Sequence, residues 1–153
     1  MRSLALFTMI LASSLLNACS ARGSVVSVCD LVNSPSSFDG MIVSISAIYI
    51  TDLRHSSSLK DARCKDAYIV PYDSDTPLDQ SIESFDNAVY GNIRDMTLRV
   101  FEVKATGRFD WDQTTKRGKF TFDKVIEFQR TTLDESGLGA NNSFKPNPLR
   151  GSA

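Results

Sequence analysis

The chain has 153 residues, of which 42% are hydrophobic and 23% are charged, and its formal net charge is −1. This is the length of a single domain. Because 17 Lys or Arg nearly balance 18 Asp or Glu, the composition argues against a polyanionic partner, and we expect no binding to nucleic acid.

The first residues have the three-part layout of a secretory signal peptide. Arg2 supplies a positive charge, Leu4–Leu16 is an apolar run, and small or polar residues follow it. A helix of about 13 residues rises only about 20 Å, whereas the hydrocarbon core of a bilayer is about 30 Å thick. The run is therefore too short to span a membrane comfortably.

The end of this stretch resembles the lipobox of bacterial lipoproteins. Leu16 stands three places before Cys19, and Ala18 directly precedes it, while Asn17 stands where a small apolar residue is usual. The resemblance implies a diacylglyceryl thioether on Cys19, cleavage after Ala18, and acylation of the new amino group by a fatty acid such as palmitate. Residues 1–18 are then a lipoprotein signal peptide and residues 19–26 a lipidated tether, whose partner is the lipid bilayer.

Both the destination and the cleavage point have alternatives. Ser20 stands where Asp is the usual inner-membrane retention signal of Gram-negative lipoproteins, so the analogy favours the outer membrane, with the protein facing the periplasm. Ordinary cleavage after Ala21 would instead release a soluble secreted protein, because Cys19 and Ala21 are acceptable small residues three and one places before that cut.

The next elements are a short helix and a long strand. Ser27 with Asp30 predicts an N-capped helix that Pro35 ends, and 36–40 predicts a turn. Residues 41–50 alternate, which predicts a strand. Its expected inward face is Met41, Val43, Ile45, Ala47 and Tyr49.

A loop, a second strand and a second helix follow. Residues 54–58 predict the loop, and 67–72 the strand, with Pro71 placing the end of that strand at a sheet edge. Thr76 and Pro77 predict the start of a helix that Gly91 ends. Its expected apolar stripe is Leu78, Ile82, Phe85 and Val89.

The last elements form a long hairpin. Strict alternation over 97–111 predicts a strand with one buried face, and 112–119 predicts a polar hairpin tip that contains Gly118. Residues 120–128 predict the returning strand, with a bulge at Asp123 and Lys124. The composition from Thr131 onward predicts a mostly disordered tail, 131–153.

With Cys19 lipidated, the even pair Cys29 and Cys64 predicts a disulfide in an exported chain. The alternative is a redox or metal site. Two distant Cys and one His are too few ligands for zinc, and no C-x-x-C occurs, so we expect neither a metal nor another cofactor.

The order of elements favours a mainly β fold with two helices, an OB-like small barrel over residues 27–130. Four strands are clear in the pattern. The fifth strand could come from a bend within 41–52 or from residues 57–61.

The same region resembles a group of small bacterial envelope proteins with OB-like barrels. The resemblance covers 28–128 and implies the barrel fold, but it carries no established activity. Ala47 stands where these proteins usually have Gly. The matching motifs are Asp30-Leu31 with Pro35, Phe38 and Gly40, Val43-x-Ile45-x-Ala47, His55, Leu59-x-Asp61-x-x-Cys64, Gly107-Arg108-Phe109 and Gly118-x-Phe120.

From these patterns we expect a non-catalytic interaction or structural module, with an envelope protein or glycan as a partner. Large side chains at strand ends suggest a ligand surface near Tyr49, Arg108 and Trp111, with His55 in a nearby loop. The alternative is an envelope hydrolase that uses His55 with an acid such as Asp61.

Nucleic-acid binding would require bases to stack on aromatic side chains within a basic groove. Lys116, Arg117 and Lys119, close to Trp111 and Phe120, are the nearest match in the sequence. We interpret them instead as a charged hairpin tip above inward-facing core aromatics.

Overall fold

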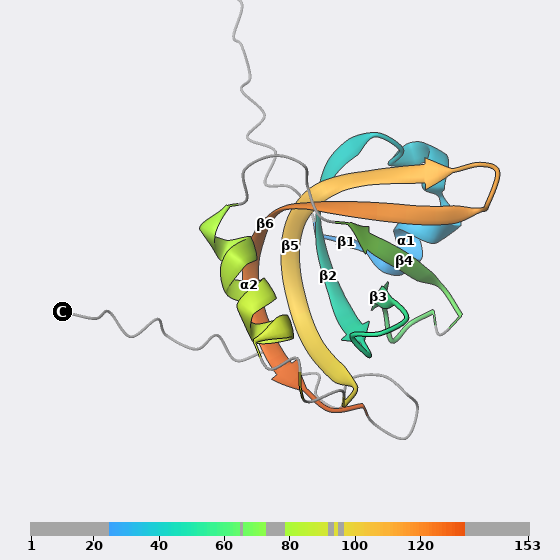
Figure 1. Ribbon diagram of the computed structural model, residues 1–153. Coiled ribbons are helices and arrows are strands. Elements are labelled where there is room, and N and C mark those ends of the chain that lie inside the picture. Colours follow the sequence, from blue (N-terminus) through green and yellow to red (C-terminus); the bar gives the residue numbers. More distant parts are fainter. Residues whose placement is uncertain (1–24, 65, 73–78, 92–93, 95–96, 134–153) are drawn as a thin grey trace, which may run out of the picture.

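The computed structural model describes residues 25–64, 66–72, 79–91, 94 and 97–133, which form a closed β-barrel with two helices (Figure 1). The predicted signal peptide, Cys19, Thr76, Pro77 and Leu78 lie outside the described residues, as does the tail from residue 134. The first strand begins at Val26 and the last ends at Thr131, one residue beyond each predicted domain boundary. The strands are β1 (Val26–Ser27), β2 (Met41–Thr51), β3 (Ser57–Lys60), β4 (Tyr68–Tyr72), β5 (Arg99–Asp112) and β6 (Arg117–Thr131).

The strand order confirms the OB-like barrel. The sheet runs β1-β2-β3-β4-β6-β5, and β2 also pairs with β5 along its whole length, which closes the cylinder. β4 and β6 are parallel, whereas the other pairs around the barrel are antiparallel. The fifth strand of the barrel is β3, so residues 57–61 and not a bend within 41–52 supply it. The predicted loop over 54–58 is correspondingly shorter, because Ser57 and Ser58 pair with β2.

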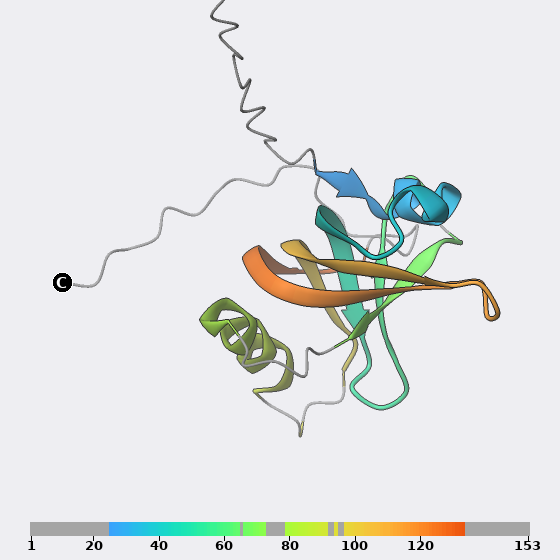
Figure 2. The same ribbon diagram turned by 90° about the horizontal axis from the view of Figure 1, so that it is seen from above.

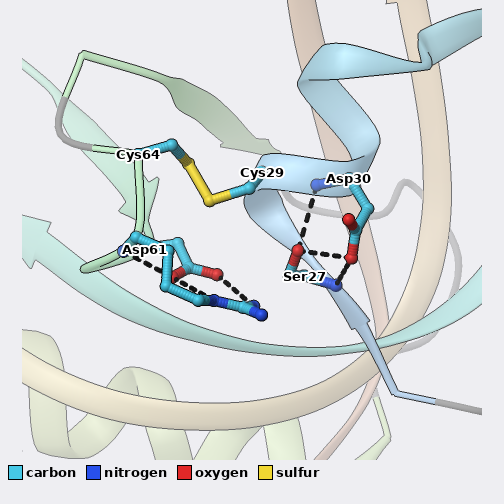
Figure 3. Close-up of a disulfide and its surroundings, with 6 residues drawn as sticks. Ser27, Cys29, Asp30, Asp61 and Cys64 are labelled. Carbon is cyan, nitrogen blue, oxygen red and sulfur yellow. Dashed lines mark hydrogen bonds and ion pairs between the residues drawn. A yellow bond between two sulfur atoms is a disulfide. The ribbon is translucent and has the colours of Figure 1, made fainter.

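Helix α1 (Val28–Asn33) closes one end of the barrel and confirms the predicted cap. Ser27 accepts a hydrogen bond from the Asp30 backbone N–H, and the Asp30 carboxylate accepts from the Ser27 backbone N–H (Figure 3). Val28 and Leu31 are fully buried. The helix ends before Pro35, which begins the short 3₁₀ helix η1 (Pro35–Ser37).

The predicted disulfide between Cys29 and Cys64 is present and joins α1 to the loop between β3 and β4 (Figure 3). Their Cα atoms are 5.7 Å apart, within the range that a disulfide bridges. Both thiols are thus used in a structural link.

Helix α2 (Gln80–Tyr90) covers the other end of the barrel, opposite α1 in both views (Figures 1 and 2). Ile82, Phe85 and Val89 are buried, as the stripe predicted. The predicted start at Thr76 and Pro77 is wrong, because Asp79 is the N-cap and accepts from the Ser81 backbone N–H. The Phe85 ring packs edge-on against three barrel aromatics, Tyr49, Phe101 and Phe128.

The hairpin of β5 and β6 forms a large part of the wall. The predicted bulge is confirmed, since the pairing skips Asp123, and a second irregularity skips Ile126. The predicted tip was too long: Gly118 lies within β6, where an added Cβ would sit 2.7 Å from the Phe109 ring. The inward face of β2 was also predicted one residue too long, because Met41 is 51% exposed while the alternating residues from Val43 to Tyr49 are buried.

Candidate functional site

The four side chains proposed from the sequence do not form one surface. Arg108 of β5 lies opposite Ile42 of β2, and Tyr49 lies seven residues further along β2. Tyr49 and Arg108 are therefore about 23 Å apart along the strand direction. Tyr49 is only 4% exposed and faces the interior. Trp111 is half-buried against Phe109.

His55 lies in the loop between β2 and β3, and its partner is Asp52, not Asp61. Its Nδ1 is 2.7 Å from an Asp52 carboxylate oxygen, and its side chain is 79% exposed. The other Asp52 oxygen accepts from the backbone N–H groups of Arg54, His55 and Ser56. The hydrogen bonds from the His55 backbone and side chain, with those from the next amides, hold the pKa of Asp52 far below its usual value. The pair therefore stabilises a tight turn.

Asp61 is buried and is held by Arg63. Arg63 donates to both carboxylate oxygens, at 3.1 Å and 2.8 Å. Burial by itself raises the pKa of Asp61, but the hydrogen bonds and charge of Arg63 outweigh it, so the pKa lies below its usual value. The predicted pairing of His55 with Asp61 is absent.

A small cleft opens in the wall where β3 and β4 diverge. The two strands pair only through Leu59 with Ile69 and Lys60 with Tyr68. The cavity beyond these pairs has about 70 Å³, enough for more than one water-sized group. It is lined by Tyr49, Ser57, Pro71, Ile82, Phe85, Asp86, Tyr90 and Phe122.

Hydroxyl groups form a short chain beside this cleft. The Tyr49 hydroxyl donates to Ser57 Oγ at 3.0 Å, and Ser57 Oγ donates to Thr51 Oγ1 at 3.0 Å. Burial raises the pKa of Tyr49, so its phenol stays protonated. The chain is therefore a neutral, satisfied network that fixes the barrel end beneath α2.

The outer surface of β4 is the best candidate for a ligand site. Leu59 and Ile69 are fully buried, so the alternate residues of β3 and β4 face outward. Tyr68 and Tyr72 are 41% and 47% exposed on this side. We call the surface the β4 face. It consists of Lys60, Tyr68, Val70, Tyr72 and Lys119.

Cations flank both tyrosines of the β4 face. Lys60 pairs directly with Tyr68, and the Lys119 ammonium lies 3.9 Å from the centre of the Tyr72 ring. On the next strand, Asp110 lies opposite Lys119 but is bound by Arg108 at 3.0 Å. Arg108 thus borders the β4 face. Of the four residues predicted for a ligand surface, it is the one that approaches the β4 face on the outer wall.

Sequence reasoning missed both tyrosines of the β4 face. The alternation within residues 68–72 predicts opposite faces for Tyr68 and Ile69, but not which face is outward. The strand that decides which face is outward is β6, which is 45 or more residues away in the sequence and contributes Lys119. Phe120, in contrast, is fully buried and is not available for stacking, which agrees with the interpretation of the basic hairpin tip.

Within the described part of the chain, no group of three or more His, Cys, Asp or Glu side chains gathers as a metal site would require. No helix among the described residues has the length and hydropathy to cross a bilayer. Comparison with protein-family models, curated proteins and solved structures gives no match.

Proposed function

We propose that this protein is a non-catalytic lipoprotein of a bacterial envelope, anchored by acyl chains on Cys19 and binding an envelope glycan through the β4 face. Two observations support the anchor. The chain has three Cys, and Cys29 and Cys64 are joined, which leaves Cys19 as the remaining thiol. A disulfide is also typical of exported proteins.

The observation that carries the binding proposal is the pair of outward tyrosines on β4. Tyr68 and Tyr72 are four residues apart, about 13 Å along the strand, so they can stack on two different rings of one chain. The corresponding wall of OB-folds binds oligosaccharides and oligonucleotides. Lys60 and Lys119 favour a ligand with carboxylates, and an acidic glycan meets this requirement outside the cytoplasm.

The hydrolase alternative has less support from the geometry. His55 has a carboxylate partner, but Asp52 already accepts three backbone hydrogen bonds, and the imidazole projects into solvent. The described cavity is lined by other residues. We therefore assign no reaction.

The anchor is tested by mass spectrometry of the mature protein and by fractionation of cells that produce the C19S variant. We expect a triacylated N-terminal Cys19 in the wild type and loss of membrane association in C19S. A mature protein that starts at Arg22, or a C19S variant that stays in the membrane, would refute the anchor.

Glycan binding is tested with the full lipidated protein in detergent and isolated cell-wall glycan. Truncating one stacked tyrosine removes about 1 kcal/mol, so Y68A and Y72A should each lower the affinity about fivefold. Y90A is the matched control, because Tyr90 is 44% exposed on α2, outside the β4 face. Equal binding by the three variants would exclude the β4 face as the glycan-binding site.

A further inference from the structure

Three exposed apolar side chains gather where the chain enters the barrel. Val25, Met41 and Ile42 are 58%, 51% and 67% exposed. β1 is parallel to β2 and pairs Val26 with Ile45, so Val25 lies beside Ser44, two residues from Ile42 and on the same outward side. We call Val25 and Ile42, which share this side, the tether patch; Met41 alternates to the other side at the start of β2.

The position of the tether patch is set by the chain that leads to it. Val25 follows Cys19 by six positions, and a fully extended chain of that length spans only about 20 Å. An acylated Cys19 would hold this part of the barrel close to the bilayer. We propose that the tether patch docks against the lipid surface, an inference that rests on the proposed anchor.

The charge on α2 favours the same orientation toward anionic lipid. Arg108 pairs with Ile42 across β2 and β5, and its Nη2 lies 3.9 Å from where a Cβ of Gly40 would be, directly before Met41. The opposite end carries α2, in which Glu83 and Asp86 are the charged residues. Arg108 is paired with Asp110, so the apolar side chains and not a net positive charge would hold this end at the bilayer, while the acidic α2 end would face away from anionic headgroups.

This orientation leaves the β4 face accessible. The register places Ile42, Arg108, Thr121 and Tyr72 on successive neighbouring strands, β2, β5, β6 and β4. Three strand spacings of about 4.8 Å put Tyr72 about 14 Å around the wall from Ile42. Docking through the patch would thus turn the tyrosines sideways, toward the aqueous compartment, and fix their height above the bilayer.

The test uses the full lipidated protein in vesicles that contain anionic phospholipid with brominated acyl chains, which quench a nearby indole. The chain has one Trp, so W111F is the background for three single-Trp variants. V25W and I42W place the indole in the patch. A88W is the matched control, because Ala88 is exposed on α2, and α2 packs on Tyr49 about 23 Å along β2 from Ile42.

We expect brominated lipid to reduce the emission of V25W and I42W and to leave that of A88W unchanged, with a wild-type far-ultraviolet circular dichroism spectrum confirming the folding of each variant. Equal quenching of all three, or quenching of none, in protein that floats with the vesicles would overturn the docking alone. Failure of the wild-type protein to float would overturn the anchor and the docking together. Loss of glycan binding in Y68A with normal quenching in I42W would show that the two surfaces act separately.

Discussion

Replacing both cysteines of the disulfide by Ala should lower the free energy of unfolding by about 4 kcal/mol. The two residues are 35 positions apart, and the loss of loop entropy in the unfolded chain for a loop of this length gives that value. For a domain of this size, a loss of 1 kcal/mol in the free energy of unfolding lowers the midpoint of thermal unfolding by roughly 4 °C or more. The midpoint of the double variant should therefore fall by about 15 °C.

Helix α1 should stay docked in the C29A/C64A variant. Val28 and Leu31 are fully buried, and the hydrogen bonds of Ser27 with Asp30 remain. The loss of stability should therefore arise mainly from the unfolded state, and the far-ultraviolet circular dichroism spectrum should be unchanged.

The assay is urea unfolding of the full chain, compared with S27A, which removes the helix cap and keeps the disulfide. S27A should cost about 1 kcal/mol, and C29A/C64A several times more. A loss below about 1 kcal/mol for the double variant would refute the loop-entropy reasoning. A collapse of the spectrum would instead show that the disulfide holds α1 in place.

Three further predictions concern packing, a buried cation and pH. G107A should destabilise the barrel by about 1–3 kcal/mol in urea unfolding, because a Cβ at position 107 would collide with the Thr121 carbonyl oxygen and lie 2.8 Å from the Phe120 ring. A G107A variant as stable as the wild type would refute this prediction. R99M should lower the free energy of unfolding by about 1.5–3 kcal/mol in the same assay, because the buried Arg99 guanidinium donates to the Val89 carbonyl at the end of α2. A decrease no larger than that caused by replacing an exposed Lys with Met would contradict this prediction. Hydrogen bonds lower the pKa of Asp52, Asp79 and Asp112 in the folded state, so their stabilisation is complete above the unfolded pKa near 3.8 and is lost as pH falls below it. Urea midpoints measured from pH 6 to pH 2 should therefore fall less steeply in D52N than in the wild type, and equal slopes would exclude the role of Asp52.

The sequence pattern predicts the long strands and the stripe of α2 well, because many residues repeat the same period. It predicts β3 poorly, since that strand has four residues and a single fully buried one, Leu59. For α2, Thr76 and Asp79 are both good caps three residues apart. A cap is identified by the backbone amide that donates to it, and Asp79 accepts from that of Ser81, whereas Thr76 lies outside the described residues.

The candidate site was harder to predict because side-chain type does not reveal the face. Tyr49 and Tyr68 both occur in alternating strands, yet one lies inside the barrel and the other outside. Lys119 reaches Tyr72 only because β4 and β6 are parallel neighbours, a pairing between distant segments that local periodicity does not contain. The disulfide was predictable because the expected export of the chain and the even pair of cysteines left after Cys19 constrain it without any knowledge of register.

The disulfide also links the stability of the barrel to the proposed ligand surface. The two ends of the barrel are covered by α1 and α2, and the interior is filled by aromatic and aliphatic side chains. Within the described residues, a ligand larger than a few atoms therefore has room only on the wall or the loops. Cys64 lies four residues before Tyr68 and is fixed to the α1 end by the bond to Cys29. The bond therefore limits the motion of the chain that leads into β4, and with it the freedom of the first tyrosine. Reduction should weaken glycan binding more in the wild type than in Y68A, because only the wild type has the Tyr68 ring to position.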